Sequence, residues 1–435
     1  MQFYSTNDKN TRVSLREATM SGMASGGGLF MPSVLPVIPR AFFNNIGDMT
    51  IQDISYVIAN ILLSDEIDSS ELKEIVNKTF DFDIPLRRVE DRLYALELFH
   101  GPTMAFKDVG ARFLARLIGH FCGQESGPVN VLVATSGDSG GAVAAGFHNI
   151  PGINVFVLYP AGILSKVQKA QFAAIGDNIY AIEVNGSFDD CQAMVKKAFA
   201  DVDLRRQVNI TSANSINIMR LVPQMFYYFH AYARLLHYGI HPGEIVCAVP
   251  CGNLGNITAG LMARRMGLPI KRFIAVNNAN DVFFDYLETG SFNPKNSVKT
   301  LASAMDVGNP SNFTRILDLY NGSHSQLAAD VIPYRCDDRD ISDTIVDTFC
   351  ADGYLLDPHG ATAFKGLKEN LQDGETGFFL ATAHPSKFPE KINNITGSKI
   401  KIPDQMEKLT AMKQRYTKIS ALYPALKNFL LETTR

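Results

Sequence analysis

The segment Leu98-Phe99-His100-Gly101-Pro102-Thr103-Met104-Ala105-Phe106-Lys107-Asp108 organises the chain. It follows a largely apolar run, breaks at Gly101-Pro102, and places one lysine at the start of a predicted helix. The helix is predicted because apolar residues recur at helical spacing from Val109 onward. The positive end of a helix dipole disfavours a cation, so Lys107 is expected to lose its proton more readily than an ordinary lysine. Covalent lysine chemistry requires that neutral amine. On this segment alone, a surface lysine after a loop remains the alternative.

The composition indicates a globular enzyme. The 435 residues suggest roughly two to four domains. The net charge of −3 argues against a nucleic-acid partner. Six irregularly spaced cysteines predict reduced thiols rather than a disulfide framework, and they predict no metal site. The sequence shows neither an apolar leader nor an apolar run of about 18 residues, so we expect a cytoplasmic protein without a membrane span.

Hydrophobic patterning predicts a mostly helical opening followed by alternating strands and helices. The opening unit has predicted helices at residues 13–20, 51–63 and 69–80. The alternation that begins near residue 95 predicts a parallel sheet covered by helices on both faces. The predicted strands are 129–134, 153–159, 179–184, 244–250, 270–276 and 378–382, and the predicted helices are 140–147, 166–174, 188–200, 218–232, 256–266, 311–320, 338–351 and 360–370. Residues 401–435 are expected to form a charged, largely helical tail.

Three polar loops each follow a predicted buried strand, at residues 135–140, 251–256 and 382–386. Ligands bind beyond the carboxyl ends of parallel strands, where helix N-termini offer free N–H groups to anions. The loop Gly252-Asn253-Leu254-Gly255-Asn256 is the best phosphate cradle, because its glycines let backbone amides approach oxygens. Many α/β loops look similar, but three such loops together with Lys107 favour a ligand site at the strand ends, with residues 252–256 as its candidate phosphate cradle.

A serine hydrolase is the alternative from another class. Gly137-Asp138-Ser139-Gly140-Gly141 matches the G-x-S-x-G nucleophile elbow, and His359 and His384 follow downstream. In that reading Ser139 is the nucleophile, but Lys107 and the phosphate loop have no role. A chymotrypsin-like protease is excluded by its all-β fold and by the order of its triad, and no G-x-G-x-x-G follows a strand to bind a nicotinamide cofactor.

The segment His100 to Asp108 resembles the pyridoxal-lysine segment of the threonine synthase family. The members of this family are fold-type II enzymes that depend on pyridoxal 5′-phosphate (PLP). Further matches in order are residues 13–18, 27–32, 135–140, 214–217, 252–256 and 382–385. The resemblance covers nearly the whole chain and points to the longer branch, which has its own N-terminal domain. It implies a two-lobed α/β fold like that of the tryptophan synthase β subunit. Its expected parts are a mostly helical domain at 1–92, a small lobe with the lysine and the carboxylate loop at 93–215, and a large lobe with the phosphate loop and the tail at 216–435.

The resemblance also implies how the cofactor is held. Lys107 would bind PLP covalently and move protons. The backbone amides and asparagine side chains of Gly252, Asn253, Leu254, Gly255 and Asn256 would hold its phosphate. Thr382 would face the pyridine nitrogen. Asp138 would lie near the 3-oxygen, where many relatives outside this branch carry asparagine. Cys251 stands where the family usually has serine, with little consequence expected because backbone groups bind there.

The implied reaction converts O-phospho-L-homoserine and water to L-threonine and phosphate, the last step of threonine biosynthesis. Thr135, Ser136 and Ser139 would bind the substrate carboxylate. Lys166, Arg112 and Arg220 are candidates for holding the substrate phosphate, with Asn214 and Asn217 as neutral donors, and His100 and Thr103 are expected to border the substrate. A PLP-dependent phospho-lyase or dehydratase that releases a keto acid is the alternative within this class. The expected partner is this small molecule, with no nucleic acid or membrane, in a monomer or small homo-oligomer.

Overall fold

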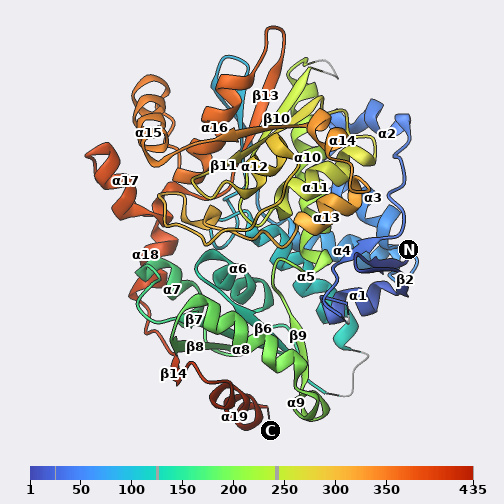
Figure 1. Ribbon diagram of the computed structural model, residues 1–435, viewed down its shortest axis with the longest axis vertical. Helices are drawn as coiled ribbons and strands as arrows, with labels where there is room; N and C mark the ends of the chain where they lie inside the picture. The colour runs from blue at the N-terminus through green and yellow to red at the C-terminus, as the bar shows by residue number, and fades with distance from the viewer. Residues whose placement is uncertain (25, 124–126, 241–243, 435) are drawn as a thin grey trace.

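Two separate β-sheets form the core of the molecule (Figure 1). The computed structural model describes residues 1–24, 26–123, 127–240 and 244–434. The larger sheet has the strand order β12-β11-β10-β13-β5-β4, and the smaller sheet has the order β14-β8-β7-β6-β9. Neighbouring strands are parallel in both sheets except that β4 runs antiparallel to β5. The predicted α/β class with two parallel-sheet lobes is therefore confirmed.

The central strands are buried on both faces, which explains their continuous apolar sequence. In β10 (Ile245–Pro250) every residue is buried. Successive side chains point to opposite faces. Thus Cys247 and Val249 join the core that includes α10 (Ile218–His237), whereas Val246 and Ala248 join the core that includes α16 (Pro358–Asn370). The other strands of the larger sheet are β4 (Leu86–Glu90), β5 (Leu93–Glu97), β11 (Arg272–Asn277), β12 (Val331–Arg335) and β13 (Thr376–Ala381).

Helices and strands alternate through the smaller sheet as the sequence predicts. Its strands are β6 (Val129–Ala134), β7 (Ile153–Pro160), β8 (Ile179–Asn185), β9 (Asn209–Ser212) and β14 (Thr417–Ser420). Its helices are α5 (Lys107–Cys122), α6 (Asp138–Phe147), α7 (Lys166–Ala173), α8 (Phe188–Ala200) and α9 (Val202–Gln207). The predicted strand 129–134 and helix 188–200 match the observed elements at both ends.

The N-terminal unit contains a small antiparallel sheet that the sequence prediction missed. Strands β1 (Phe3–Ser5), β2 (Asp8–Val13) and β3 (Phe30–Pro32) pair in the order β2-β1-β3. Most of β2 is exposed, so it carries no alternating pattern. The first helix starts later than predicted, because Val13 ends β2 and Ser14 caps α1 (Leu15–Ser21) by accepting a hydrogen bond from the Glu17 amide. The remaining elements of this unit are α2 (Arg40–Asn45), η1 (Ile46–Asp48), α3 (Ile51–Leu63) and α4 (Ser69–Thr79).

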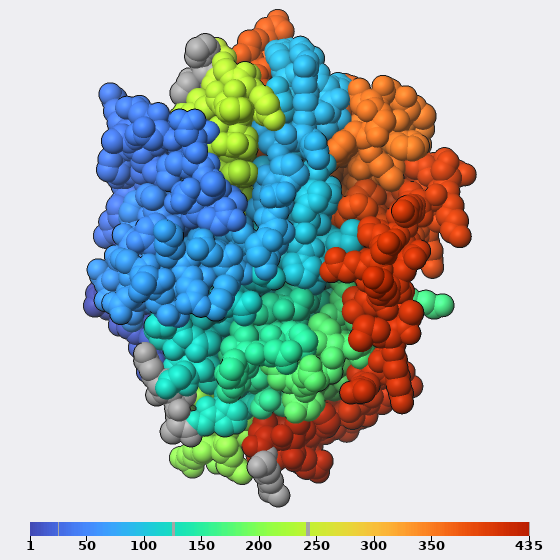
Figure 2. All heavy atoms as spheres, turned by 180° about the vertical axis from the view of Figure 1, so that it is seen from behind, coloured from blue at the N-terminus to red at the C-terminus, as the bar shows by residue number. Residues whose placement is uncertain are grey.

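Two segments join a different sheet from the one expected. Strand β5 was assigned to the small lobe, but it pairs with β13 in the larger sheet. The C-terminal tail was assigned to the large lobe, but β14 pairs with β8 and extends the smaller sheet. Helix α19 (Tyr423–Thr433) buries Leu426 and Leu430 in the core of that sheet. Figure 2 shows the C-terminal residues, in red, running along one side of the molecule. Arg435 lies outside the described residues.

The remaining elements surround the larger sheet or connect the two sheets. They are α11 (Gly255–Arg265), α12 (Val282–Thr289), η2 (Ser303–Met305), α13 (Phe313–Leu319), α14 (His324–Asp330), α15 (Asp338–Asp352), η3 (Pro385–Lys387), α17 (Pro389–Thr396) and α18 (Asp404–Ala411). None of the described helices has the length and apolar character needed to cross a membrane.

Candidate active site

The lysine segment is held against the chain that leaves β13. The Phe106 amide donates to the Thr382 carbonyl at 2.9 Å, and the His384 amide donates to the Met104 carbonyl at 3.1 Å. An isolated antiparallel bridge joins Ala105 to Ala383. Two predicted site segments that are almost 280 residues apart in sequence therefore lie side by side, as the positions of Lys107 and Thr382 show. Helix α5 begins at Lys107, as predicted.

The Lys107 amine is poised to lose its proton near neutral pH. Burial lowers its pKa, and the Arg220 and Lys387 cations lower it further, against the Asp138 carboxylate. The result is a pKa of about 8. The predicted direction is therefore confirmed, although burial is the largest cause. A neutral lysine amine can attack an aldehyde, whereas an ammonium cannot.

Asp138 is the first residue of α6 and stays ionised although it is buried. Burial alone raises the pKa of a carboxyl group. Here the nearby Lys387 and Lys107 cations lower the pKa of Asp138 to about 2. Its Oδ1 atom lies 2.9 Å from the Lys387 ammonium and accepts a hydrogen bond of 3.3 Å from Gln168. The expected cofactor-binding position therefore carries a fixed negative charge.

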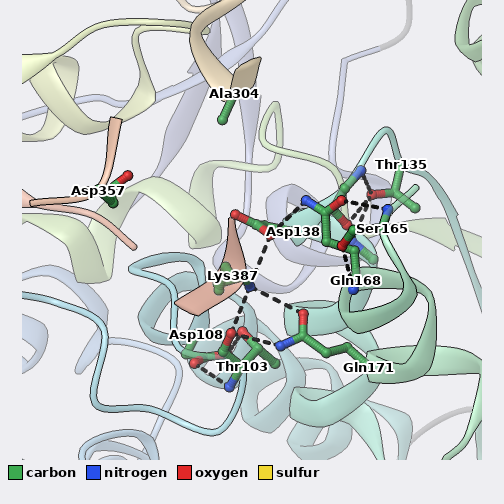
Figure 3. Close-up of polar contacts among 12 residues, drawn as sticks. Thr103, Asp108, Thr135, Asp138, Ser165, Gln168, Gln171, Ala304, Asp357 and Lys387 are labelled. Atoms are coloured by element: carbon green, nitrogen blue, oxygen red, sulfur yellow. Dashed lines mark hydrogen bonds and ion pairs between the residues drawn. The ribbon is translucent and has the colours of Figure 1, made fainter. Parts of the chain in front are cut away.

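Lys387 is the site residue that the sequence analysis missed. Its side chain is fully buried in η3, and its ammonium contacts the Asp138 carboxylate (Figure 3). The same ammonium donates to the Thr103 carbonyl at 2.7 Å and to Gln171 Oε1 at 3.2 Å. Its only signal in the sequence is a lysine five residues after Thr382, directly after the third polar loop. A lysine in a Pro-Ser-Lys turn looks like a surface residue until its partners are known.

The phosphate loop has the backbone geometry expected of it. Leu254 adopts a left-handed conformation (φ 61°) and precedes the first turn of α11. A Cβ atom on Gly252 would lie 2.7 Å from the Ala304 carbonyl oxygen, so only glycine fits against η2. Backbone strain of this kind persists where function requires it. The amides at this helix start are oriented for an anion.

The asparagine side chains of that loop form hydrogen bonds within the protein. Asn253 donates to Ser215 Oγ at 2.7 Å and accepts from the Ser311 amide at 2.6 Å. Asn256 donates to the Pro250 carbonyl at 2.9 Å, and its Oδ1 accepts from the Ile257 amide. Both side chains therefore shape the loop, and the backbone amides at the start of α11 offer further donors to a phosphate.

The carboxylate loop divides into a structural residue and two available hydroxyls. The Thr135 hydroxyl donates to the Gly137 carbonyl and accepts from the amides of Gly137 and Gly140, so it folds the loop instead of contacting substrate. Within the described part of the chain, the Ser136 and Ser139 hydroxyls form no hydrogen bond. Ser136 is exposed and Ser139 is partly exposed, so both are accessible to a ligand.

Three further substrate candidates serve the fold. Asn217 caps α10 and donates to the Thr19 carbonyl at 2.9 Å. Thr103 binds the buried Asp108 carboxylate through its amide at 2.8 Å and its hydroxyl at 2.6 Å. Arg112 points to α4, where it binds the Thr79 carbonyl at 3.1 Å and Asp81. The resemblance implies that these side chains lie near the substrate, whereas the structure shows each of them bonded to another part of the protein.

The other candidates differ in burial, and one of them, Arg220, acts electrostatically on Lys107. Arg220 is buried, donates to the Ala213 carbonyl at 2.8 Å, and is close enough to Lys107 to lower its pKa. Lys166 is exposed at the start of α7, and Asn214 is half-buried just before α10. His100 lies 2.7 Å from Glu97 at the end of β5, which Tyr354 also binds.

The hydrolase alternative lacks its triad. His359 lies 2.6 Å from Asp357, but its Nε2 atom accepts the Ala304 amide hydrogen at 3.0 Å. His384 contacts Ser386, not Ser139, at 2.7 Å. His359 is thus packed in the first turn of α16 and His384 caps η3, and within the described residues neither is paired with Ser139. A serine nucleophile needs an adjacent base.

The donor set fits PLP, whose reactive and polar groups are an aldehyde, a phosphate and a ring nitrogen. An amine with a lowered pKa suits the aldehyde, and the backbone amides at the start of α11 suit the phosphate. Thr382 carries a hydroxyl on the loop that adjoins the lysine segment. Two parallel sheets with these groups between them define a PLP-dependent enzyme of fold type II. In agreement, residues 83–382 match the family model for pyridoxal-phosphate dependent enzymes.

The two ends of the chain match more specific family models. Residues 2–80 match the threonine synthase N terminus and residues 359–430 match the C-terminal region of threonine synthase. The chain is 40% identical to threonine synthase of Haemophilus influenzae, with 100% of both chains covered. It is similar to the crystal structure of Escherichia coli threonine synthase (TM-score 0.93, 38% identity, 100% of both chains). It is also similar to PLP-bound threonine synthase of Brucella melitensis (TM-score 0.93, 29% identity, 100% of both chains). The chain belongs to the threonine synthase family.

Proposed function

We propose that this enzyme converts O-phospho-L-homoserine and water to L-threonine and phosphate, with PLP bound at Lys107. The observation that carries the proposal is the meeting of Lys107, the Thr382 segment and the ionised Asp138 at one site. The phosphate loop at the start of α11 adds the anion-binding group that the cofactor requires.

In the proposed arrangement, each loop holds one part of the bound molecules. The backbone amides of Gly252, Asn253, Leu254, Gly255 and Asn256 bind the cofactor phosphate. Thr382 would offer its hydroxyl to the ring nitrogen, and Asp138 would lie near the 3-oxygen. When bound, PLP supplies an electron sink for the carbanion that forms at the substrate Cα.

Lys107 is the proposed catalytic base and acid. With a pKa of about 8, its Nζ atom can accept the Cα proton of the substrate and return a proton later in the reaction. Ser136 and Ser139 have hydroxyls available to bind the substrate carboxylate. Arg220 is the favoured cation for the leaving phosphate because it is buried and acts on Lys107 electrostatically. Lys166 and Asn214, on neighbouring loops, are the other candidates for that phosphate.

Product analysis separates this reaction from the dehydratase alternative. The purified enzyme is given O-phospho-L-homoserine, and threonine, 2-ketobutyrate and phosphate are measured together. We expect threonine and phosphate in equal amounts, with little keto acid. If 2-ketobutyrate accounts for most of the phosphate released, the enzyme is instead an eliminating phospho-lyase, although it uses the same cofactor.

We also propose that the enzyme works in the cytoplasm, as a monomer or small homo-oligomer acting on a small molecule without nucleic acid or membrane. The net charge of −3 supports the absence of a nucleic-acid partner. Light scattering during size-exclusion chromatography measures the mass of the assembly. A single peak of one to a few multiples of 47.9 kDa is expected. A large polydisperse assembly would contradict this part of the proposal.

A further inference from the structure

The buried Lys387 ammonium connects segments from both sheets. Lys387 follows the last strand of the larger sheet, whereas Asp138 and Gln171 lie on helices of the smaller sheet. Thr103, its third partner, belongs to the loop that leads to Lys107. Figure 3 shows these groups around the Lys387 side chain. A lysine ammonium has three donors, and here three oxygen atoms surround it.

The partners of Lys387 are themselves held in place. Gln171 donates to the Thr103 carbonyl at 2.9 Å, so that one carbonyl accepts from both Gln171 and Lys387. Gln168 binds the same Oδ1 atom of Asp138 that Lys387 contacts. The second oxygen of Asp138, Oδ2, has no hydrogen bond within the described residues. One carboxylate oxygen is thus fixed by the protein, and the other is left for the site.

We propose that Lys387 is a positioning residue that holds the Asp138 carboxylate beside Lys107 and joins the two sheets across the active site. This inference rests on the proposed role of Lys107 in binding the cofactor. Lys387 does not act on the substrate in this account. It keeps a buried carboxylate charged and oriented where a neutral or differently oriented group would otherwise be favoured.

The proposal has an electrostatic consequence for Lys107. The charged groups that act on this amine are Asp138 from α6, Arg220 from α10 and Lys387 from η3. On its own helix, the neighbouring Asp108 carboxylate is bound by Thr103. Lys387 and Lys107 are the two cations that lower the pKa of Asp138, so removing the Lys387 charge leaves Lys107 to balance this carboxylate. The pKa of the Lys107 amine then rises, so this amine retains its proton to higher pH.

The test measures how fast full-length protein, freed of cofactor, captures added PLP at different pH values. Borohydride trapping followed by peptide mass spectrometry counts the adduct on Lys107, so the readout is independent of turnover. Four proteins form a cycle: wild type, Lys387→Met, Asp138→Asn and the double variant. The ionisations of PLP itself are common to all four.

We expect the pH midpoint of capture to rise by about one unit in Lys387→Met, and to fall in Asp138→Asn, where the Lys387 charge is unopposed. In the double variant both charges are absent, so its midpoint should return toward that of wild type. Lys391→Met is the matched control. Lys391 is half-buried and donates to the Leu301 carbonyl at 2.8 Å without a carboxylate partner at the site. Its midpoint should equal that of wild type.

The outcomes separate this inference from the proposed function. If wild type yields no adduct on Lys107, the proposed function fails. If wild type yields the adduct but all four midpoints coincide, Lys387 has only a structural role and the inference is overturned. If Lys387→Met alone does not fold, the double variant still tests the inference, because it lacks both Lys387 and Asp138 charges. Its pH midpoint of capture is then compared with that of Asp138→Asn: a higher midpoint in the double variant supports the inference, and equal midpoints contradict it.

Discussion

At the scale of single residues, Gly252 shows how backbone fit constrains the site. A methyl group at this position would lie 2.7 Å from the Ala304 carbonyl oxygen and 3.1 Å from Met305 Cα. Both are backbone atoms, so the phosphate loop or η2 must move. We predict that Gly252→Ala weakens PLP binding about tenfold or more, because overpacking of this kind costs about 1–3 kcal/mol.

Equilibrium titration with PLP measures this effect. Gly127→Ala is the control, since a Cβ atom there meets nothing within 4 Å. Equal PLP affinity for the two variants would show that the close contact between Gly252 and η2 does not constrain cofactor binding.

Single residues also show what sequence can reveal about the site. Local signals, namely a helix start after a Gly-Pro break, single out Lys107, but its role in binding the cofactor comes from the family resemblance. The structural roles of Thr103, Thr135 and Asn217 could not be found in this way, because a hydroxyl or amide side chain suits a ligand equally well, and only the folded chain shows which partner each one takes. Asn217, for example, binds the carbonyl of Thr19, 198 residues away. For Lys387 the deciding partner, Asp138, is likewise on another element.

At the scale of elements, α10 contains a buried histidine that makes stability depend on pH. His230 donates from Nε2 to the Ile84 carbonyl at 2.9 Å. Burial lowers its pKa from 6.5 to about 4, with a contribution from Arg234. Between these two values the unfolded chain binds a proton that the folded chain does not. Stability should therefore fall as the pH is lowered from about 6.5 toward 4.

The size of this effect is measurable by urea unfolding at pH 7 and pH 5. The His230 contribution alone predicts a loss of about 2 kcal/mol between these pH values. His230→Gln keeps a donor for the Ile84 carbonyl but cannot titrate, so it should lose about 2 kcal/mol less than wild type over the same interval. Identical losses in the two proteins would mean that His230 does not cause the pH dependence.

Some helices and strands could be predicted from the hydrophobic pattern of the sequence, and others could not. Strand β6 and helix α8 matched their predictions because their apolar residues form a continuous run and a helical pattern, respectively. Strands β2 and β14 are mostly exposed and short, so neither has a hydrophobic period to detect. Their pairing partners, not their own composition, make them strands.

At the scale of the whole molecule, the C-terminal segment closes the smaller sheet. Leu430 of α19 is fully buried among residues of that sheet's core, including Leu132 and Val195. We predict that Leu430→Ala lowers the free energy of unfolding by about 2–4 kcal/mol. Leu422 is 67% exposed, so Leu422→Ala should change it by less than about 0.5 kcal/mol. Urea unfolding of the two variants measures both values, and equal effects would contradict the packing of α19.

The site around Lys107 lies where the two sheets meet. The lysine segment precedes the smaller sheet, while its hydrogen-bonded neighbour Thr382 follows the last strand of the larger one. Lys387 spans the same junction. The site is thus made by the approach of two sheets, which a sequence pattern indicates only through the loops at their strand ends.

Borohydride reduction of the purified enzyme, followed by peptide mapping, identifies the amine that binds PLP. Reduction fixes PLP to the amine that holds it. The account predicts a single pyridoxyl group on Lys107, and no such group in Lys107→Ala, which should still fold. A pyridoxyl group on another lysine, or none in the wild-type protein, would contradict the account.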